Sequence, residues 1–414
     1  FTFPAPDLLP RLISSYFQLP HYLFPILHRP TFEADFAAGK HLKDEGFGAI
    51  VLLLCAIGAR ITDDPRVFLD HPDRPAHPHS AGWAWFRQVQ VVRNTALVDP
   101  SVYDLQIIAL SAQYMAGISP AQACWSMVGI GIRMAQDVGA HRKRMYQEQT
   151  VATELWKRAF WCRGPALMAL DVWFSATLGR SCALSLNSID VELPPDCDDE
   201  YWLEKDPAKA FKQPPGKPSD LSYFVCLVRL YLIYSHALRT IYSPRSHKDT
   251  AEFSHAEWSK RVVSELDSAL TAWYESLPPH LIWNPAAENP IHFMQSSSLH
   301  SGYRLVQMTI HRPSIGGSGN PSSISLQSLA ICTSAARACI HVQKEHQQRR
   351  PGLISAGPLA SLLSCYTHVP TFVAAVVLLL RIWLAKRTEM RIDVEKEMDD
   401  IHAVVNFLAL GETR

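Results

Sequence analysis

Apolar residues recur along much of this chain at alternating steps of three and four, which is the spacing of one face of an α-helix. The segment after Asp104 shows the pattern, with apolar residues at positions 105, 108, 112 and 115. Residues 47–61 are apolar nearly all round, as in a fully buried helix. The same periodicity predicts further helices at residues 119–139, 150–178, 222–242, 254–273, 290–312, 325–346 and 394–408.

Strands leave a different pattern, a strict alternation of apolar and polar residues, and the chain shows no convincing example of it. A fixed-period repeat is also not found. The predicted fold class is therefore mainly α: a large multi-helix array with no substantial β-sheet.

Residues with known preferences for helix ends mark several boundaries. Asp104 is placed to cap a helix, and Ser119-Pro120 adds a proline at a first helical position. Gly139 and Gly179 are placed as the left-handed residues that end helices. Because proline removes a helical hydrogen bond, a kink or break is predicted at Gly164-Pro165.

The organisation of the chain follows from its length and its polar stretches. A length of 414 residues suggests two or three domains or one large helical array. We predict a linker at residues 205–218, which are polar and proline-bearing, between an N-terminal helical half (1–204) and a C-terminal half (219–414) packed against it. The most apolar run, residues 370–380, is shorter than the roughly 20 residues of a membrane helix, so a buried helix is predicted. Since the chain begins at Phe1 rather than Met, we expect an N-terminal region to precede it.

Composition narrows the class of protein. Hydrophobic residues make up 48% of the chain and charged residues 19%, as in a folded protein with a large core. The charge is balanced, with 39 Lys and Arg against 39 Asp and Glu. Domains that grip DNA phosphates usually carry a clustered cationic excess, so DNA binding is not expected of this chain itself.

Cysteine and histidine patterns bear on metal binding. The nine cysteines are scattered without C-x-x-C spacing, which favours buried thiols in a reducing compartment. Cys332 and Cys339 have a spacing that occurs within zinc clusters, but they lack partners and lie in a helical pattern. His71, His77 and His79 lie in a proline-rich loop, where a solvated loop is favoured over a Zn or Cu site. No metal site is predicted in this chain.

Candidate catalytic patterns are incomplete. Residues 316–319 are glycine-rich but lack the lysine and the preceding strand of a phosphate loop. Asp63-Asp64 and Asp399-Asp400 lack the further acid that a helical Mg²⁺-dependent enzyme places three residues on. The basic run 141–144 follows a helix end, where cations interact with the helix dipole; an import or phosphate-binding patch is the alternative. We therefore predict no catalytic residues and no enzyme.

Several stretches, in order, carry a resemblance to a known family. They are residues 23–32 (LFPILHRPTF), 135–142 (AQDVGAHR), 154–161 (ELWKRAFW), 170–171, 178–180, the acidic loop 190–194, residues 303–313, Cys332 and residues 335–337. Their order and spacing resemble the middle homology region of fungal binuclear zinc-cluster transcription factors. The chain departs from that pattern at Gly164-Pro165, Val172 and Ser181.

The resemblance implies a nuclear regulator of transcription by RNA polymerase II. In such proteins an N-terminal six-cysteine cluster, outside this chain, binds two zinc ions and reads DNA, often as a dimer. The middle region restrains or tunes the activator, sometimes in response to a metabolite. The resemblance thus implies DNA contact and zinc only in that other region, no cofactor in this chain and no membrane. Candidate partners are a second copy, a small-molecule effector and the transcription machinery.

The residues of the family pattern for which we expect structural roles are Arg29, Pro30, Asp171, Gly179, Arg180, Arg312 and Pro313. Asp171 and Arg180 lie nine residues apart around a helix end, so an ion pair or hydrogen bond between them is predicted to pin that end. No ligand-binding residues are predicted. Two alternatives remain open from the sequence: a helical enzyme, and a helical small-molecule-binding or scaffold protein without a DNA role.

Overall fold

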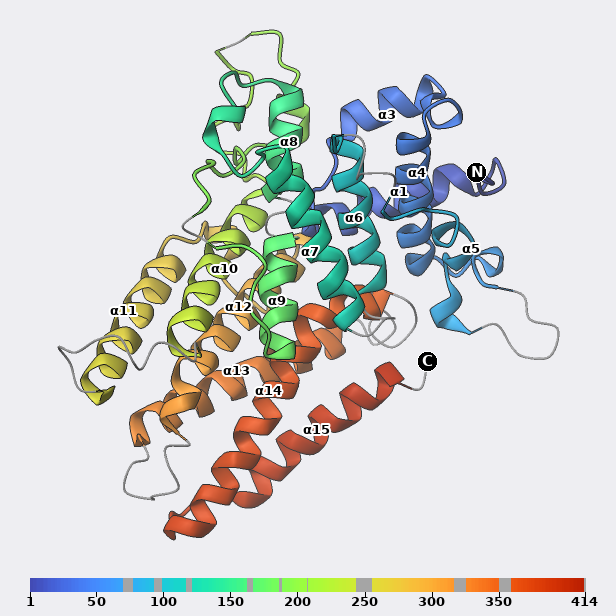
Figure 1. Ribbon diagram of the computed structural model, residues 1–414. Coiled ribbons are helices and arrows are strands. Elements are labelled where there is room, and N and C mark those ends of the chain that lie inside the picture. Colours follow the sequence, from blue (N-terminus) through green and yellow to red (C-terminus); the bar gives the residue numbers. More distant parts are fainter. Residues whose placement is uncertain are drawn as a thin grey trace. The chain divides into compact units, whose positions relative to one another are not determined.

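The computed structural model describes residues 1–69, 77–92, 99–116, 121–161, 167–185, 188–206, 208–242, 255–315, 325–349 and 359–412 (Figure 1). Within these ranges the regular structure is helical and no strand is present, which confirms the predicted mainly α class. The chain divides into two compact units. One is Phe1–Tyr231 with Gly357–Leu362, and the other is Leu232–Ala356 with Leu363–Arg414.

The first unit is built around one buried helix, α4 (Glu45–Gly58), in which every residue from Gly46 to Gly58 is buried. It packs against α1 (Leu9–Gln18) and α6 (Val102–Met115). The helices approach so closely that a Cβ at Gly58 would lie 2.1 Å from the carbonyl oxygen of Leu12, so only glycine fits there. The buried helix predicted from residues 47–61 is thus confirmed.

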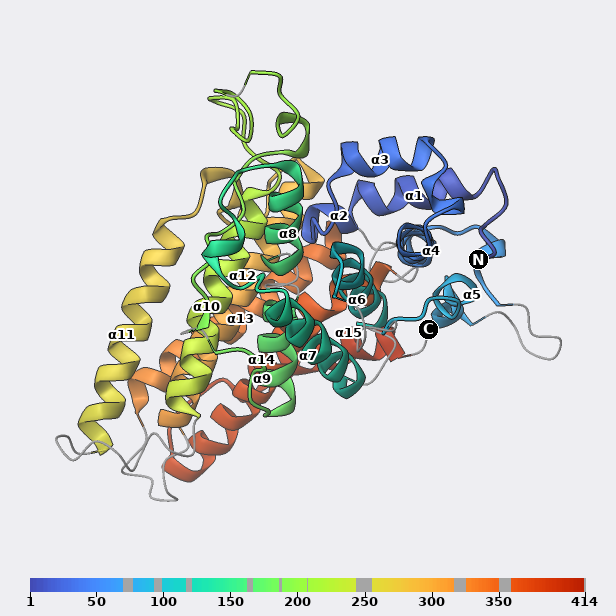
Figure 2. The same cartoon turned by 45° about the horizontal axis from the view of Figure 1, so that its top comes forward.

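Helices α7 (Ala121–Asp137), α8 (Val151–Trp161) and α9 (Leu167–Leu178) follow on the side of α6 that faces away from α4 (Figures 1 and 2). The unit also contains α2 (Pro20–Leu23), α3 (Arg29–Ala37), α5 (Trp83–Phe86) and the 3₁₀ turn η7 (Asp199–Tyr201). Helix α7 packs against α9 and α6, and α8 contacts α6.

Two of the helix ends predicted from the sequence are confirmed by the structure. Gly139 and Gly179 have φ of +73° and +64°, the left-handed conformation predicted for both. The cap of α6 differs: Ser101 is the N-cap, and Asp104, predicted as the cap, completes a capping box from the third helical position. The predicted features at Ser119-Pro120 and Gly164-Pro165 lie outside the described residues.

The second unit consists of long helices. Helix α10 (Ser222–Ile241) spans the division between the units, and α11 (His255–Glu275), α12 (Pro290–His311), α13 (Leu326–Arg349), α14 (Leu359–Thr388) and α15 (Val394–Glu412) follow. Helices α12 and α13 confirm the helices predicted at 290–312 and 325–346, and they pack against each other. Glu397 of α15 is 1% exposed and accepts hydrogen bonds from Arg337 of α13 and Arg381 of α14, which ties three helices together.

Two stretches, Ser222–Ile241 and Thr367–Thr388, are long and apolar enough to cross a membrane by length and composition alone. Only about half of each is buried, 56% and 50% of the tested windows, and core helices of soluble proteins meet the same criterion. The buried helix predicted at residues 370–380 is therefore confirmed for one face of α14 only. The other face exposes apolar side chains.

Candidate functional site

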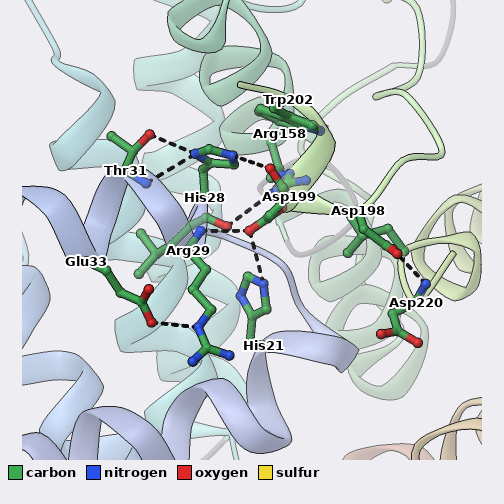
Figure 3. A network of polar contacts seen from close by, with 12 residues as sticks. His21, His28, Arg29, Thr31, Glu33, Arg158, Asp198, Asp199, Trp202 and Asp220 are labelled. Atoms are coloured by element: carbon green, nitrogen blue, oxygen red, sulfur yellow. Dashed lines mark hydrogen bonds and ion pairs between the residues drawn. The ribbon is translucent and has the colours of Figure 1, made fainter. Parts of the chain in front are cut away.

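Three stretches that are distant in the sequence meet at the carboxylate of Asp199 (Figure 3). Oδ1 of Asp199 accepts a hydrogen bond from Nη1 of Arg158 at 2.6 Å. Oδ2 accepts one from the backbone N–H of Arg29 at 2.7 Å and lies 3.4 Å from Nε2 of His21. Asp199 therefore joins the first turn of η7 to α8 and to the segment that contains α2 and the start of α3. We call these contacts of its carboxylate with Arg158, Arg29 and His21, together with the side chains that pack on them, the Asp199 junction.

Arg158 is the cation of this junction, and only 1% of its surface is exposed. The same Nη1 that bonds Asp199 also donates to the carbonyl oxygen of Leu27 at 3.0 Å. Its guanidinium carbon lies 4.0 Å from the centre of a Trp202 ring, which places the cation over the face of the indole. Among the described residues, Nη2 of Arg158 has no hydrogen-bond partner. The charge is therefore balanced mainly by Asp199 and the indole.

His28 completes the junction as a neutral ring. It stacks on Trp202, with ring centres 4.8 Å apart, and Nε2 lies 2.9 Å from the backbone carbonyl of Asp199. Since a carbonyl only accepts, Nε2 carries the proton. Nδ1 is then the acceptor for the hydroxyl of Thr31 at 2.7 Å and caps α3. Burial lowers the pKa of His28, which agrees with a neutral ring that donates on one side and accepts on the other.

The electrostatics of Asp199 depend on these partners. Burial alone would raise the pKa of Asp199, but the Arg158 charge and the hydrogen bond from His21 outweigh it. The pKa is held far below its ordinary value of 3.8, so the group is an anion. Taking an anion and a cation out of water together is costly, and their attraction offsets this cost only while they stay paired. Loss of Asp199 would therefore leave Arg158 as an uncompensated buried charge.

The neighbouring residue, Asp198, ties down the segment that the sequence predicts as a linker. Its carboxylate accepts from Ser219 Oγ at 3.0 Å, from the backbone N–H of Asp220 at 2.9 Å and from Gln213 Nε2 at 2.9 Å. Lys217 pairs with Glu200 at 2.6 Å. The described part of 205–218 is thus bonded back onto the chain before it, and the division of the chain falls later, after Tyr231. The domain boundary at 205–218 stays a prediction.

A second, smaller junction surrounds Asp171 on α9. Oδ2 accepts the backbone N–H of Ala183 at 2.7 Å, and Oδ1 accepts the Ser175 hydroxyl at 3.4 Å. Arg180 is exposed, and its guanidinium lies 4.7 Å from the centre of a Trp125 ring. The predicted Asp171–Arg180 contact is therefore wrong, because Asp171 points into the core while Arg180 follows the left-handed Gly179 outward. The helix end is still pinned, but through Ala183.

Burial raises the pKa of Asp171 to about 6, in spite of the hydrogen bonds that it accepts from Ala183 and Ser175. Asp171 and Asp199 thus differ because only Asp199 has a cation beside it. Asp171 is the titratable one near neutral pH, and Asp199 is the permanent charge.

The other residues for which the family pattern predicts structural roles lie apart from one another. Arg29 contributes its backbone to Asp199, while its side chain pairs with Glu33 on the surface, and Pro30 lies in the first turn of α3. Arg312 and Pro313 lie in the second unit, in the 3₁₀ turn Arg312–Ser314, where Arg312 donates to the hydroxyl of Tyr242 at 3.1 Å. These seven residues therefore do not form one site, and their family roles stay predictions.

Several of the other residues that the sequence offered as candidates for phosphate or metal binding form ion pairs or are buried in the structure. In the basic run, Lys143 pairs with Glu192 at 2.5 Å, and Arg142 lies 3.7 Å from Asp190. Cys332 and Cys339 are buried thiols, as predicted. Among the described residues no group of three or more His, Cys, Asp or Glu could hold a metal ion. His71 and residues 316–319 lie outside the described residues.

Asp64 and Asp400, from the two paired-acid candidates, form ion pairs. Asp64 pairs with Arg66 at 2.8 Å and with Arg11 at 3.0 Å. Asp400 pairs with Lys344 at 2.7 Å. Both acids therefore serve as partners of nearby cations.

Sequence patterns missed the centre of the site. Arg158 and His28 lie inside the stretches that carry the family resemblance, but neither was assigned a role. Asp199 lies just after the acidic loop 190–194, in the run Asp198-Asp199-Glu200, and an acidic run by itself is usually solvated. Trp202, three residues on, was the available signal that part of this run packs against the core.

Taken together, the fold and the site define an all-helical domain whose buried charges join its segments. The model of the fungal specific transcription factor domain matches residues 13–275 of the chain. The chain belongs to this family, and it is a regulatory region of a fungal transcription factor. The matched residues include the whole Asp199 junction.

Curated relatives agree with this assignment. The chain is 27% identical over 321 residues to the transcriptional activator protein acu-15 of Neurospora crassa, an alignment that covers 76% of this chain and 32% of that protein. It is 25% identical to cutinase transcription factor 1 alpha of Fusarium vanettenii, with 81% and 35% covered, and 26% identical to nitrogen assimilation transcription factor nit-4 of Neurospora crassa, with 80% and 30% covered. The chain thus spans about a third of the length of these relatives. No solved structure matches it.

Proposed function

We propose that this chain sets the output of a fungal transcription factor that acts on RNA polymerase II genes in the nucleus, while another part of the whole protein reads DNA through a zinc cluster. The relatives' names support a role in transcription. The balance of 39 cationic and 39 anionic residues leaves this chain no charge excess for gripping DNA. A non-catalytic role is part of the proposal, and it agrees with relatives that are named as regulators rather than enzymes.

The observation that carries the proposal is the Asp199 junction. It ties the opening stretch of the family pattern, the central stretch on α8 and the segment after the acidic loop to one carboxylate. A buried ion pair does not weaken gradually, because partial opening leaves a charge without its partner. The junction therefore suits an element with two discrete arrangements, which a regulatory domain needs if a partner is to change its output.

The partners stay proposals as well. A second copy of the chain, a small-molecule effector and the transcription machinery are the candidates, and each would act by favouring one arrangement of the junction over the other. Contact with DNA is proposed only through the other part of the whole protein.

A reporter experiment tests the proposal. The chain is fused between a heterologous DNA-binding module and a strong activation segment, and transcription is measured at equal protein abundance and equal promoter occupancy. We expect the intact chain to change the output, Asp199→Asn to abolish that change, and Glu192→Gln to preserve it, because Glu192 lies in an exposed ion pair. Equal output from the fusions with and without the chain would refute a regulatory role.

A further inference from the structure

Helix α14 carries an apolar stripe that the core does not use. Phe372, Val376, Leu379 and Trp383 are 55%, 45%, 47% and 51% exposed. Their spacing of four, three and four residues puts them on one side of the helix, over a length of about 16 Å. Large apolar side chains scattered singly on a surface are ordinary, but a contiguous row of them marks a surface that binds something.

The opposite side of the same helix faces the core. Ala374, Val377, Leu378, Ile382 and Ala385 are all at most 8% exposed. Helix α14 is held in place on that side through Arg381, which bonds Glu397 of α15, and through His368, whose ring packs edge-on against Phe407. The stripe is therefore presented by a fixed helix.

The stripe ends in two cations on the same side. Lys386 and Arg387 lie three and four residues after Trp383, and both are exposed. The guanidinium of Arg387 lies 4.8 Å from the centre of a Trp383 ring, so the cation borders the last apolar residue. No ion pair of either side chain is present among the described residues. An occupant that matches this surface is apolar along one face and acidic at one end.

The area of the stripe limits the size of the occupant. Four half-exposed large side chains offer on the order of 400 Å² of apolar surface, about half of the ~800 Å² that a stable interface takes from each partner. A second copy would present the same stripe with the same two cations, Lys386 and Arg387, and residues 372–387 contain no acidic residue to meet them. A single amphipathic helix suits both the width and the charge of the stripe.

We propose that the exposed side of α14 docks an amphipathic helix from a partner protein, with apolar residues at steps of three and four and acidic residues at the end that meets Lys386 and Arg387. This docking does not depend on the proposed function of the Asp199 junction, which lies in the other compact unit.

The test uses the whole 414-residue chain and a fluorescent helical peptide of about 14 residues, long enough to cover the stripe. The peptide has leucines at steps of three and four and glutamates in one terminal turn; a second peptide has lysines in place of the glutamates. We expect binding of the acidic peptide by fluorescence anisotropy, and binding of the lysine peptide weaker by at least about tenfold.

Variants locate the binding. Leu379→Asp is expected to abolish it, and the pair Lys386→Glu with Arg387→Glu to reverse the preference between the two peptides. Val405→Asp on α15, 54% exposed, is the matched control and is expected to bind normally. Circular dichroism checks the fold of each variant, and if Leu379→Asp does not fold, the charge reversal alone decides.

Several results would overturn the proposal. Failure of the acidic peptide to bind, equal binding of both peptides, or binding that is unaffected by Leu379→Asp and by the charge reversal would each do so. Self-association of the chain that Leu379→Asp abolishes would identify a second copy as the occupant instead. Binding of the stripe to anionic lipid vesicles in preference to the acidic peptide would identify a membrane surface instead.

Discussion

Replacement of Asp199 by Asn removes the charge of the junction while it keeps the size of the side chain. In the native protein Arg158 donates to Asp199 at 2.6 Å and is 1% exposed, so the variant leaves this cation buried beside a neutral amide. Loss of one partner of a buried ion pair typically costs about 3–5 kcal/mol. We therefore expect the free energy of unfolding to fall by that amount at pH 7.

The assay is urea unfolding at pH 7, followed by hydrogen exchange of the segments on either side of the junction. The control is Glu192→Gln, since the Lys143–Glu192 pair is 67% and 65% exposed and such pairs contribute less than about 1 kcal/mol. Arg158→Met should recover part of the loss when it is added to Asp199→Asn, because it removes the orphaned cation. A loss no larger than that of the control, or no recovery in the double variant, would show that Asp199 is not the counter-charge that stabilises Arg158.

Acid dependence gives an independent check of the same pair. The native pKa of Asp199 lies far below its ordinary value of 3.8, so its contribution is complete above that value and is lost as the pH falls below it. The difference in stability between the native chain and Asp199→Asn should therefore shrink as the pH is lowered from 5 towards 2. A difference that stays constant over this window would contradict an ionised Asp199.

Three further predictions concern other buried groups. The native pKa of Asp171, about 6, lies above 3.8, so the stability contributed by its neutral form is lost as the pH rises. Relative to Asp171→Asn, the native chain should lose about 3 kcal/mol between pH 3 and 8 in urea unfolding, and a constant difference would contradict this. Glu397→Gln should lower the free energy of unfolding of the second unit by about 1.5–3 kcal/mol, since the two arginines that it leaves unpaired are partly exposed. Faster hydrogen exchange in α13 and α15 would show this loss, and unchanged exchange would contradict the contact between the three helices. Burial raises the pKa of the Cys55 and Cys339 thiols, so both should resist alkylation until the chain unfolds. Mass spectrometry after treatment with an alkylating reagent measures this, and prompt labelling of the folded chain would contradict their burial.

The helices could be predicted because their signal is local. The uninterrupted apolar run at residues 47–61 has no other way to bury itself, and Gly139 and Gly179 end helices by a preference of a single residue. The cap at Asp104 was misplaced by three residues because Ser101 and Asp104 cap α6 together, and either residue type fits the N-cap.

The site could not be predicted because its partners are distant in sequence. Arg158 and Asp199 are 41 residues apart, and Arg29 is 170 residues from Asp199. Asp171 and Arg180 looked like natural partners at nine residues, but the left-handed turn at Gly179 sends the arginine to Trp125. Opposite charges that are close in sequence were thus a poor guide, and burial decided which charges paired.

The regulatory role of this chain is tested most directly by measuring promoter occupancy and transcription together in a fungus whose own gene carries Asp199→Asn, with Glu192→Gln as the control. If this chain regulates output and another part reads DNA, then at matched protein abundance promoter occupancy stays near normal while transcription of the bound genes changes. Unchanged transcription at normal occupancy, or loss of occupancy at matched abundance, would contradict a regulatory role that is separate from DNA binding.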